Sequence, residues 1–258
     1  MRTPGDRIDN LDASLFDAIP SQTSIDTRRS LLAVHRATAR RHGEVSYLEI
    51  GSHLGGSLQP YLLDPRCRAI FSIDPRPAAQ KDDRAPGFVA AYEENSTARM
   101  LDLLRKLAPE EVAKVRCFES DAALVDPALV SPPPQVAFID GEHTRRAVLS
   151  DFAFVRRVLA DGGTVVFDDF SIVYPAVLEI CAGLRRQRRR FLPVRLLGRA
   201  FALFFEPDLV RADPFLERCR RRRRLTLPRY RLKLLGKSLL PGPAGRLARS
   251  LRRPADGR

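Results

Sequence analysis

The sequence predicts an α/β protein in which a doubly wound, seven-stranded sheet is mostly parallel. Short apolar runs rich in β-branched residues alternate with helical patterns through residues 44–207. The first apolar run ends in a glycine turn at Gly51–Gly56. The last two runs, 191–197 and 200–205, are separated only by Gly198-Arg199, which predicts a hairpin that adds one antiparallel strand. Together these patterns are typical of a Rossmann-like sheet.

The elements follow in a regular order along the chain. Thr23-Ser24 precede a helical pattern that ends near Gly43, so residues 1–43 are expected to form a helical segment that covers the ligand site. Residues 80–87 are expected to form a loop. Parallel strands are predicted at 45–50, 68–74, 114–119, 135–140 and 164–168. Helices are predicted after Gly56 and at about 94–107, 144–159 and 173–186.

Composition places the chain among globular proteins with a real core, because 44% of its residues are apolar. No apolar run approaches the roughly 20 residues of a membrane span, and the N-terminus has no apolar secretory region. Four scattered cysteines without a C-x-x-C pair indicate reduced thiols rather than disulfides or zinc. We therefore expect a cytoplasmic protein, with attachment to the inner membrane surface as the alternative.

The positive charge is concentrated at one end. Residues 216–258 hold 15 Lys and Arg against Glu217 and Asp256, so the whole net charge of +13 lies there and the rest is neutral. Residues 208–258 are thus predicted to be a basic tail, partly disordered or amphipathic. An anionic lipid surface or an acidic partner suits this tail better than nucleic acid, because Tyr230 is the only aromatic residue in the basic stretch 216–258 for stacking on bases.

The glycine turn predicts a binding loop for a small ligand, since a strand, a tight turn and a helix start bring backbone N–H groups together. A dinucleotide loop would need glycine where His53 stands, and a P-loop would need lysine where Ser57 stands. Glu49, directly before the turn, suits a cationic ligand. S-adenosylmethionine carries a sulfonium and an ammonium group and no phosphate, so it fits this loop. A purely structural turn is the alternative.

Acidic residues follow each predicted parallel strand, and in such a sheet ligands bind where the strands end. Asp74 follows Gly51 by 23 residues, close to the spacing at which a carboxylate reaches ribose hydroxyls. Asp121 could accept a hydrogen bond from an adenine amino group, although Ser120-Asp121 is also typical of a helix cap. The set consists of Glu49, Asp74, Asp121, Asp140, Asp168 and Asp169.

Asp140, His143, Asp168 and Asp169 are predicted to form the reacting end of the site. Strands four and five are neighbours, so their carboxylates should converge, and a divalent cation or a cationic ligand would relieve their repulsion. Such an oxygen-rich site suits Mg²⁺ or Mn²⁺ better than zinc. His143 is placed to remove a proton from a substrate hydroxyl, and an ordinary position at a helix start is its alternative.

Four segments carry a resemblance to a known family: Tyr47–Ser52, Ser72–Asp74, Phe138–His143 and Gly162–Asp169. With them the chain resembles class I S-adenosylmethionine-dependent methyltransferases over about Val45–Phe205. Within this group it is similar to small bacterial methyltransferase domains whose fourth strand ends in Asp-Gly-x-His. The resemblance implies a methyltransferase domain at residues 44–207.

The resemblance also implies roles for particular residues. Metal-dependent O-methyltransferases of this fold hold Mg²⁺ with acids at the places of Asp140, Asp168 and Asp169, while other members use no metal. His143 and Asp140 would be catalytic: Asp140 or the metal orients the acceptor oxygen and His143 removes its proton. The cofactor would contact Glu49, Gly51, Ser52, His53, Gly55, Asp74, Ser120, Asp121 and Asp140.

The function implied is O-methylation of a small-molecule or sugar hydroxyl, with cell-surface glycans among the acceptors. Two alternatives remain open at this stage. One is an RNA methyltransferase that holds its substrate with the basic tail. The other is a protein that binds S-adenosylmethionine without catalysis.

Overall fold

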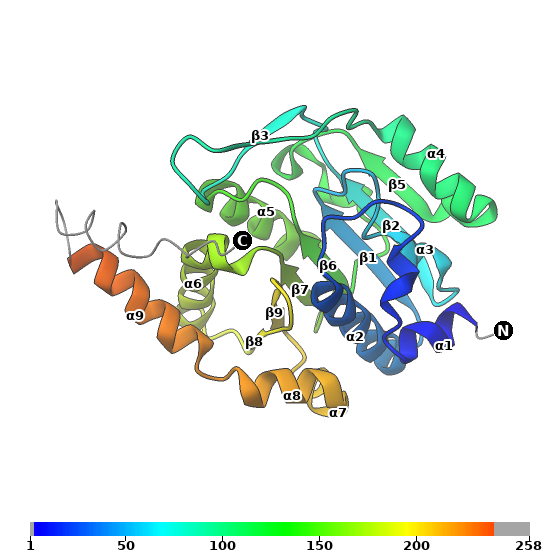
Figure 1. The fold of residues 1–258 in the computed structure, drawn as a ribbon. Helices are drawn as coiled ribbons and strands as arrows, with labels where there is room; N and C mark the ends of the chain where they lie inside the picture. Colours follow the sequence, from blue (N-terminus) through cyan, green and yellow to red (C-terminus); the bar gives the residue numbers. More distant parts are fainter. Residues whose placement is uncertain (1–2, 240–258) are drawn as a thin grey trace, which may run out of the picture. The chain divides into compact units, whose positions relative to one another are not determined.

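The computed structural model describes residues 3–239 and divides the chain into two compact units, Met1–Arg223 and Arg224–Arg258. The first unit is built on one sheet of seven strands in the order β5-β2-β1-β6-β7-β9-β8 (Figure 1). These strands are β1 (Val45–Ile50), β2 (Cys67–Ile73), β5 (Val115–Phe118), β6 (Val136–Ile139), β7 (Thr164–Phe167), β8 (Leu192–Arg195) and β9 (Phe201–Phe204).

The sheet confirms the predicted topology. Neighbours from β5 to β7 pair in parallel, whereas β9 is antiparallel to both β7 and β8. Because β9 runs against the others, the turn between β8 and β9 lies at the edge where the parallel strands end. This places residues 196–200 beside the tips of β6 and β7.

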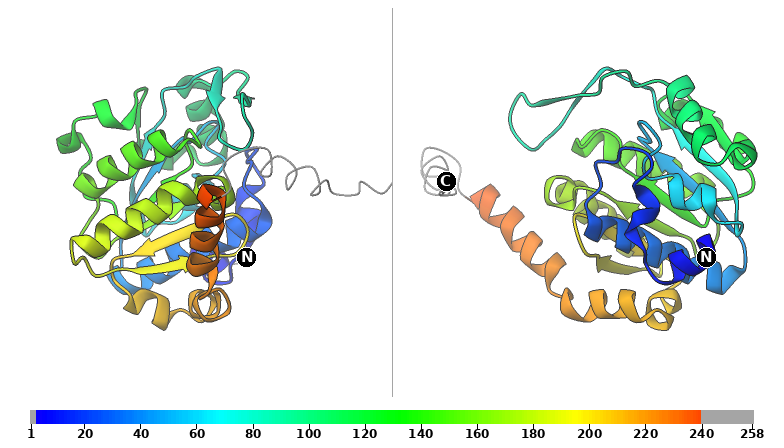
Figure 2. Two further views of the ribbon diagram at one scale, coloured as in Figure 1. Left: turned by 90° about the vertical axis from the view of Figure 1, so that its left-hand side faces the viewer. Right: turned by 45° about the vertical axis from the view of Figure 1, so that its right-hand side comes forward.

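Helices cover both faces of the sheet (Figure 2). The longer ones are α2 (Ile25–His42), α4 (Thr97–Leu107), α5 (Arg145–Val158) and α6 (Phe170–Arg186). The shorter ones are α1 (Pro4–Asp9), α3 (Gln59–Leu63), α7 (Asp208–Ala212) and α8 (Pro214–Arg222), with 3-10 turns at Ala13–Phe16, Pro109–Lys114, Ala122–Leu124 and Pro127–Leu129. The second unit contains α9 (Thr226–Leu239).

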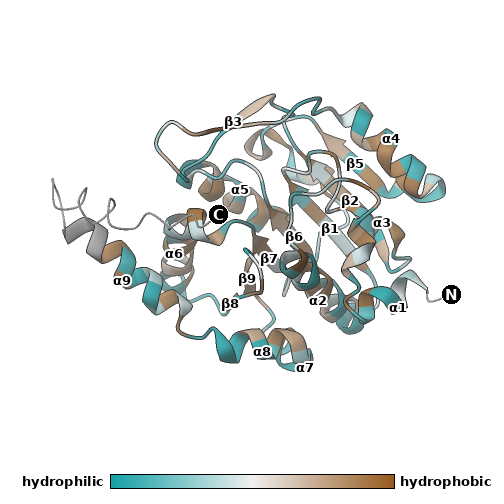
Figure 3. Ribbon diagram, in the orientation of Figure 1, coloured by the Kyte–Doolittle hydropathy of each residue, from teal (hydrophilic) through white to brown (hydrophobic). Residues whose placement is uncertain are grey.

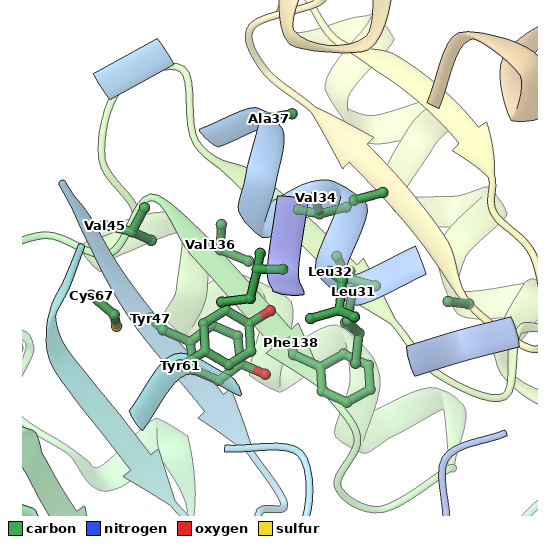
Figure 4. Packing of buried hydrophobic residues seen from close by; sticks show 14 of the residues in the cluster. Leu31, Leu32, Val34, Ala37, Val45, Tyr47, Tyr61, Cys67, Val136 and Phe138 are labelled. Carbon is green, nitrogen blue, oxygen red and sulfur yellow. The ribbon is translucent and has the colours of Figure 1, made fainter. Parts of the chain in front are cut away.

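The strands are apolar on both faces, which is why the sheet is buried and coloured largely brown in Figure 3. On one face, Tyr47 and Phe138 pack with Leu31 and Leu32 of α2 and with Tyr61 of α3 (Figure 4). The Tyr47 and Tyr61 rings stack at 3.6 Å. On the other face, Phe152 of α5 lies 6.1 Å from the ring of Phe167.

The leading helix α2 begins and ends where the sequence predicts. The Ser24 hydroxyl accepts a hydrogen bond from the Thr27 N–H, and Gly43 ends the helix with φ at 77°. None of the helices among the described residues is both long and apolar enough to cross a bilayer.

One prediction from the sequence is corrected. The segment 80–87 is not simply a loop, because β3 (Ala79–Lys81) and β4 (Val89–Ala91) form an antiparallel hairpin around it. The first compact unit extends to Arg223 and includes α7 and α8, which follow the predicted start of the tail at residue 208. Buried Leu209, Val210 and Leu216 hold these helices there, together with the Arg36–Asp213 ion pair at 2.7 Å. Residues 240–258 of the predicted tail lie outside the described residues.

Candidate active site

A pocket enclosing about 830 Å³, open solvent included, lies at the carboxyl ends of β1, β6 and β7. Five parts of the chain surround it: the N-terminal segment Pro20–Thr23, the glycine loop after β1, the β3–β4 hairpin, the tips of β6 and β7, and Arg199 of the β8–β9 turn. Of the predicted site residues, it is lined by Gly51, Ser52, His53, Asp140, His143, Asp168 and Asp169.

The glycine loop depends on the absence of side chains at two positions. Gly51 has φ at 88°, and a Cβ there would lie 2.4 Å from the Asp140 carbonyl oxygen. A Cβ at Gly56 would lie 2.3 Å from the carbonyl oxygen of Pro20. The first glycine thus lets the loop touch the end of β6, and the second lets the N-terminal segment lie directly on the loop.

The N-terminal segment is fastened to the loop by a buried amide. Gln59 accepts from the Ile19 N–H at 2.9 Å, and its own amide donates to the carbonyls of Phe16, Ile19 and Gly56 at 2.8–2.9 Å. One fully buried side chain therefore satisfies backbone groups on both parts. This explains how Pro20–Thr23 come to form a wall of the pocket.

Glu49 is placed differently from the expectation that it faces the ligand. Its carboxyl group is fully buried and accepts hydrogen bonds from the Tyr47 hydroxyl at 2.6 Å and from the Ser57 hydroxyl. Burial raises the pKa of Glu49 to about 8 in spite of these two donors. In this arrangement the residue braces the glycine loop from inside rather than lining the pocket.

Asp74 lies under the same loop. Its carboxylate accepts from the His53 N–H at 2.9 Å and from the Arg76 N–H at 2.8 Å. The Arg76 guanidinium donates to the His53 carbonyl and, at 3.2–3.4 Å, to the hydroxyls of Ser52 and Ser72. Asp74 and Arg76 together thus position the loop, and both side chains are almost fully buried.

Like Glu49 and Asp74, three further predicted cofactor residues lie outside the lining of this pocket: Gly55, Ser120 and Asp121. Asp121 is exposed at the start of a 3-10 turn and makes no side-chain cap, while the Ser120 hydroxyl donates to the Asp121 carbonyl. Gly55 has φ at 79° and faces Met100 and Leu104 of α4. Their predicted roles rest on the resemblance alone.

His143 lies among three carboxylates. Its Nδ1 atom is 3.3 Å from an oxygen of Asp82 and 3.8 Å from one of Asp169, and its Nε2 atom is 3.3 Å from Asp140 Oδ1. Burial by itself would lower the pKa of His143, but the carboxylates of Asp140, Asp169 and Asp168 raise it to about 9. The imidazole is therefore held as a cation at neutral pH.

The acids at the tip of β7 are also buried. Asp168 is 1% exposed, and its Oδ1 atom has no hydrogen-bond partner among the described residues. Burial and the charge of Asp140 raise the pKa of Asp168 to about 7. Asp169 adopts a left-handed conformation, with φ at 41°, directly before α6. This turn directs the two carboxylates toward Arg199, which comes from the β8–β9 turn.

The expected metal ligands fit a divalent cation poorly in this arrangement. Among the described residues, no three or more His, Cys, Asp or Glu side chains are placed to hold a metal ion. Arg199 Nη2 lies 3.2 Å from Asp168 Oδ2, and Arg199 Nε lies 3.0 Å from Asp169 Oδ1. A guanidinium thus already contacts two of the three acids.

Sequence reasoning missed Asp82, Arg84, Tyr92 and Arg199, all in contact with the site. Asp82 lies beside His143, where a short bridge joins the hairpin to the turn after β6. The Tyr92 ring meets His53 edge to face at 5.2 Å. These residues stand in segments with weak strand patterns, so only the charges at 82, 84 and 199 could have signalled them.

Comparison with known proteins agrees with the fold. Residues 48–170 match a family model described as a methyltransferase domain. Uncharacterized protein R132 of Acanthamoeba polyphaga mimivirus is 27% identical over 150 residues, which cover 55% of this chain and 62% of that protein. The chain therefore spans about three fifths of the curated relative it matches.

Two solved structures are similar. The O-methyltransferase TomG from Streptomyces achromogenes, in complex with SAM, has a TM-score of 0.50 at 14% identity, covering 79% of this chain and 90% of its own. The MycE methyltransferase of the mycinamycin pathway, in complex with Mg and SAH, has a TM-score of 0.47 at 16% identity, covering 79% of this chain and 55% of its own.

The sheet order, the pocket at the ends of the strands and the family match agree with a class I methyltransferase fold. Residues 48–170, slightly less than half of the chain, are similar to a methyltransferase domain. The resemblance inferred from the four sequence segments is thereby confirmed.

Proposed function

We propose that this protein transfers the methyl group of S-adenosylmethionine to a hydroxyl oxygen of a small molecule or sugar. One observation carries the proposal: a single pocket joins the glycine loop to the charged side chains that follow β6 and β7. When bound, S-adenosylmethionine supplies an electrophilic methyl group. The residues of the chain have to hold the acceptor oxygen in line with it, and correct orientation alone accounts for much of the rate enhancement in such reactions.

The pocket lining supports a hydroxyl-bearing acceptor. Ser21, Gln22 and Thr23 line it together with the acids, and Tyr92 adds a further hydroxyl. Each of these groups can donate or accept a hydrogen bond, which suits a sugar-like molecule.

In the proposed mechanism Asp140 orients the acceptor oxygen and His143 takes its proton. Because the pKa of His143 is raised to about 9, only a small fraction of the imidazole is neutral at pH 7. We therefore expect the rate to rise from pH 7 toward pH 9. No step is assigned to a metal ion, because the arginine contacts described above leave the three acids poorly arranged for one.

Cofactor binding gives the most direct test. We expect S-adenosylhomocysteine to bind in isothermal titration, and Asp74→Asn to weaken that binding at least tenfold, about 1.4 kcal/mol, if Asp74 accepts ribose hydroxyl protons. Asp102→Asn is the matched control, since Asp102 pairs with Lys106 on the exposed side of α4. Absence of binding by the wild-type protein would end the methyl-transfer proposal, and an unchanged Asp74→Asn would remove the ribose assignment alone.

The partner of the basic segment stays a prediction. An anionic lipid surface or an acidic partner follows from its charge, and RNA is the alternative.

A further inference from the structure

The place that the sequence assigns to a divalent cation is taken by an arginine side chain. Arg199 Nη2 is 3.2 Å from Asp168 Oδ2 and Arg199 Nε is 3.0 Å from Asp169 Oδ1, so one guanidinium lies against both acids of the β7 tip. A guanidinium presents its N–H groups in a planar fork that matches carboxylate oxygens. It can therefore hold two carboxylates that would otherwise repel each other.

The backbone around Arg199 is fixed at several points. Its N–H donates to the Thr27 hydroxyl at 3.1 Å, and its carbonyl accepts from the Phe170 N–H at 3.0 Å. A Cβ on the preceding Gly198 would lie 2.4 Å from the Thr27 hydroxyl oxygen, so only glycine allows the turn to approach α2 this closely. The start of α2 and the start of α6 together hold the turn in place.

The guanidinium also reaches the N-terminal wall of the pocket. Arg199 Nη2 donates to the Gln22 carbonyl at 3.0 Å. Because the side chain is 41% exposed and lines the pocket, it remains accessible to a bound molecule. Arg199 is thus both anchored to the protein and open to the site.

The remaining acids also have cations from the chain. Arg84 lies 2.8 Å from Asp82 and 3.6 Å from Asp169, and His143 lies 3.3 Å from Asp140. Cations of the chain thus already lie against all four carboxylates, which leaves less negative charge for a divalent cation to neutralise.

We propose that Arg199 supplies the positive charge that the sequence pattern assigned to a divalent cation, so that the acceptor side of the pocket is organised by a guanidinium and needs no metal. This inference rests on the proposed function only in calling that side the acceptor side. It assigns Arg199 as a positioning residue for Asp168 and Asp169. It also predicts a latent metal site that appears when the guanidinium is removed.

Binding of Mn²⁺, followed by electron paramagnetic resonance on the full chain, tests this directly. Wild type is expected to bind Mn²⁺ only weakly at this site. Arg199→Met, which keeps the length but not the charge, is expected to bind at least tenfold more tightly, because two acids lose their cation. Arg199→Lys restores a charge and should bind as weakly as wild type. Arg145→Met, which breaks an exposed pair with Glu179, is the matched control and should not differ from wild type.

Two results would overturn the inference. One is tight Mn²⁺ binding by wild type that Arg199→Met does not strengthen, and the other is an Arg199→Met variant that binds Mn²⁺ no better than wild type. If Arg199→Met does not fold, Arg199→Gln takes its place in the same comparison. Titration of S-adenosylhomocysteine into the same samples with EDTA or Mg²⁺ separates the two proposals. Loss of that binding in wild type would reject methyl transfer and leave the metal result standing.

Discussion

The two halves of the sheet edge satisfy their carboxylates in different ways. At the tips of β1 and β2, Glu49 accepts from two hydroxyl groups and Asp74 from two backbone N–H groups. At the tips of β6 and β7, Asp168 and Asp169 lie against arginines instead. The tips of β1 and β2, which we call the cofactor half after the proposed function, thus use mostly neutral donors, apart from the Arg76–Asp74 ion pair at 3.4 Å. The tips of β6 and β7, the proposed acceptor half, use cations.

This difference has consequences for what each half can do. Burial raises the pKa of Glu49 in spite of its two neutral donors, so Glu49 supports the glycine loop and offers no charge to the pocket. Ion pairs keep the acceptor half charged while leaving Arg84 and Arg199 partly exposed. A loop supported by an uncharged, buried acid therefore faces a wall of partly exposed charges.

The largest loss of stability is expected at Gly51, where the glycine loop after β1 contacts the end of β6. Gly51→Ala places a Cβ 2.4 Å from the Asp140 carbonyl oxygen and forces alanine to φ at 88°. We expect a loss of about 5 kcal/mol in the free energy of unfolding, at the upper end for single substitutions, or no folded protein. Urea unfolding measures it.

Comparison with Gly43→Ala separates the cost of backbone strain at positive φ from the cost of a steric clash. Gly43 has φ at 77° with no atom within 4 Å of an added Cβ among the described residues, so this variant should lose only about 1–2 kcal/mol. Equal losses in the two variants would mean that the loop does not need its contact with β6.

The sequence predicts the β-sheet and this junction because their signals are local. Apolar runs gave five parallel strands, and Gly51 marks a turn whatever surrounds it. The acids at the strand ends were also predictable, since each lies within three residues of the end of its strand in the chain. The residues that contact these acids were not predictable in this way.

The partners of the acids come from distant segments. Arg199 lies 31 positions after Asp168 and meets it only because β9 runs antiparallel beside β7. Asp82 and Arg84 lie in a hairpin with few apolar residues, whose position depends on contacts with the turn after β6. Many arginines in this sequence are equally plausible as surface groups, so pattern alone cannot choose Arg199.

The next largest effect is the pH dependence of stability that Glu49 causes. The folded pKa of Glu49, about 8, is above its ordinary value of 4.5, so the folded protein binds this proton more tightly than the unfolded chain. Stability is then fully present below pH 4.5 and is lost as pH rises toward 8. We expect the free energy of unfolding of the wild type to fall between pH 5 and pH 8. Glu49→Gln, which keeps the shape of the side chain, should abolish at most about 4 kcal/mol of that fall.

Urea unfolding of wild type and Glu49→Gln at pH 5, 6.5 and 8 gives this difference directly. Asp151 and Asp168 also have raised pKa values, so both proteins should lose some stability with pH. Parallel curves for the two proteins would show that Glu49 is ionised in the folded state, and the two halves would then be alike in charge.

The smallest effects compare one donor from each half. Tyr47→Phe removes a buried hydroxyl from Glu49 and should cost about 2 kcal/mol at any salt concentration, because it leaves a buried oxygen with one donor fewer. Arg84→Met removes an ion pair whose guanidinium is 44% exposed, and should cost less than about 1 kcal/mol, with the loss shrinking in 0.5 M salt. Unfolding at low and high salt checks both. A large, salt-independent loss in Arg84→Met would mean that the acceptor half is as rigidly built as the glycine loop, since only buried, fully paired groups escape screening.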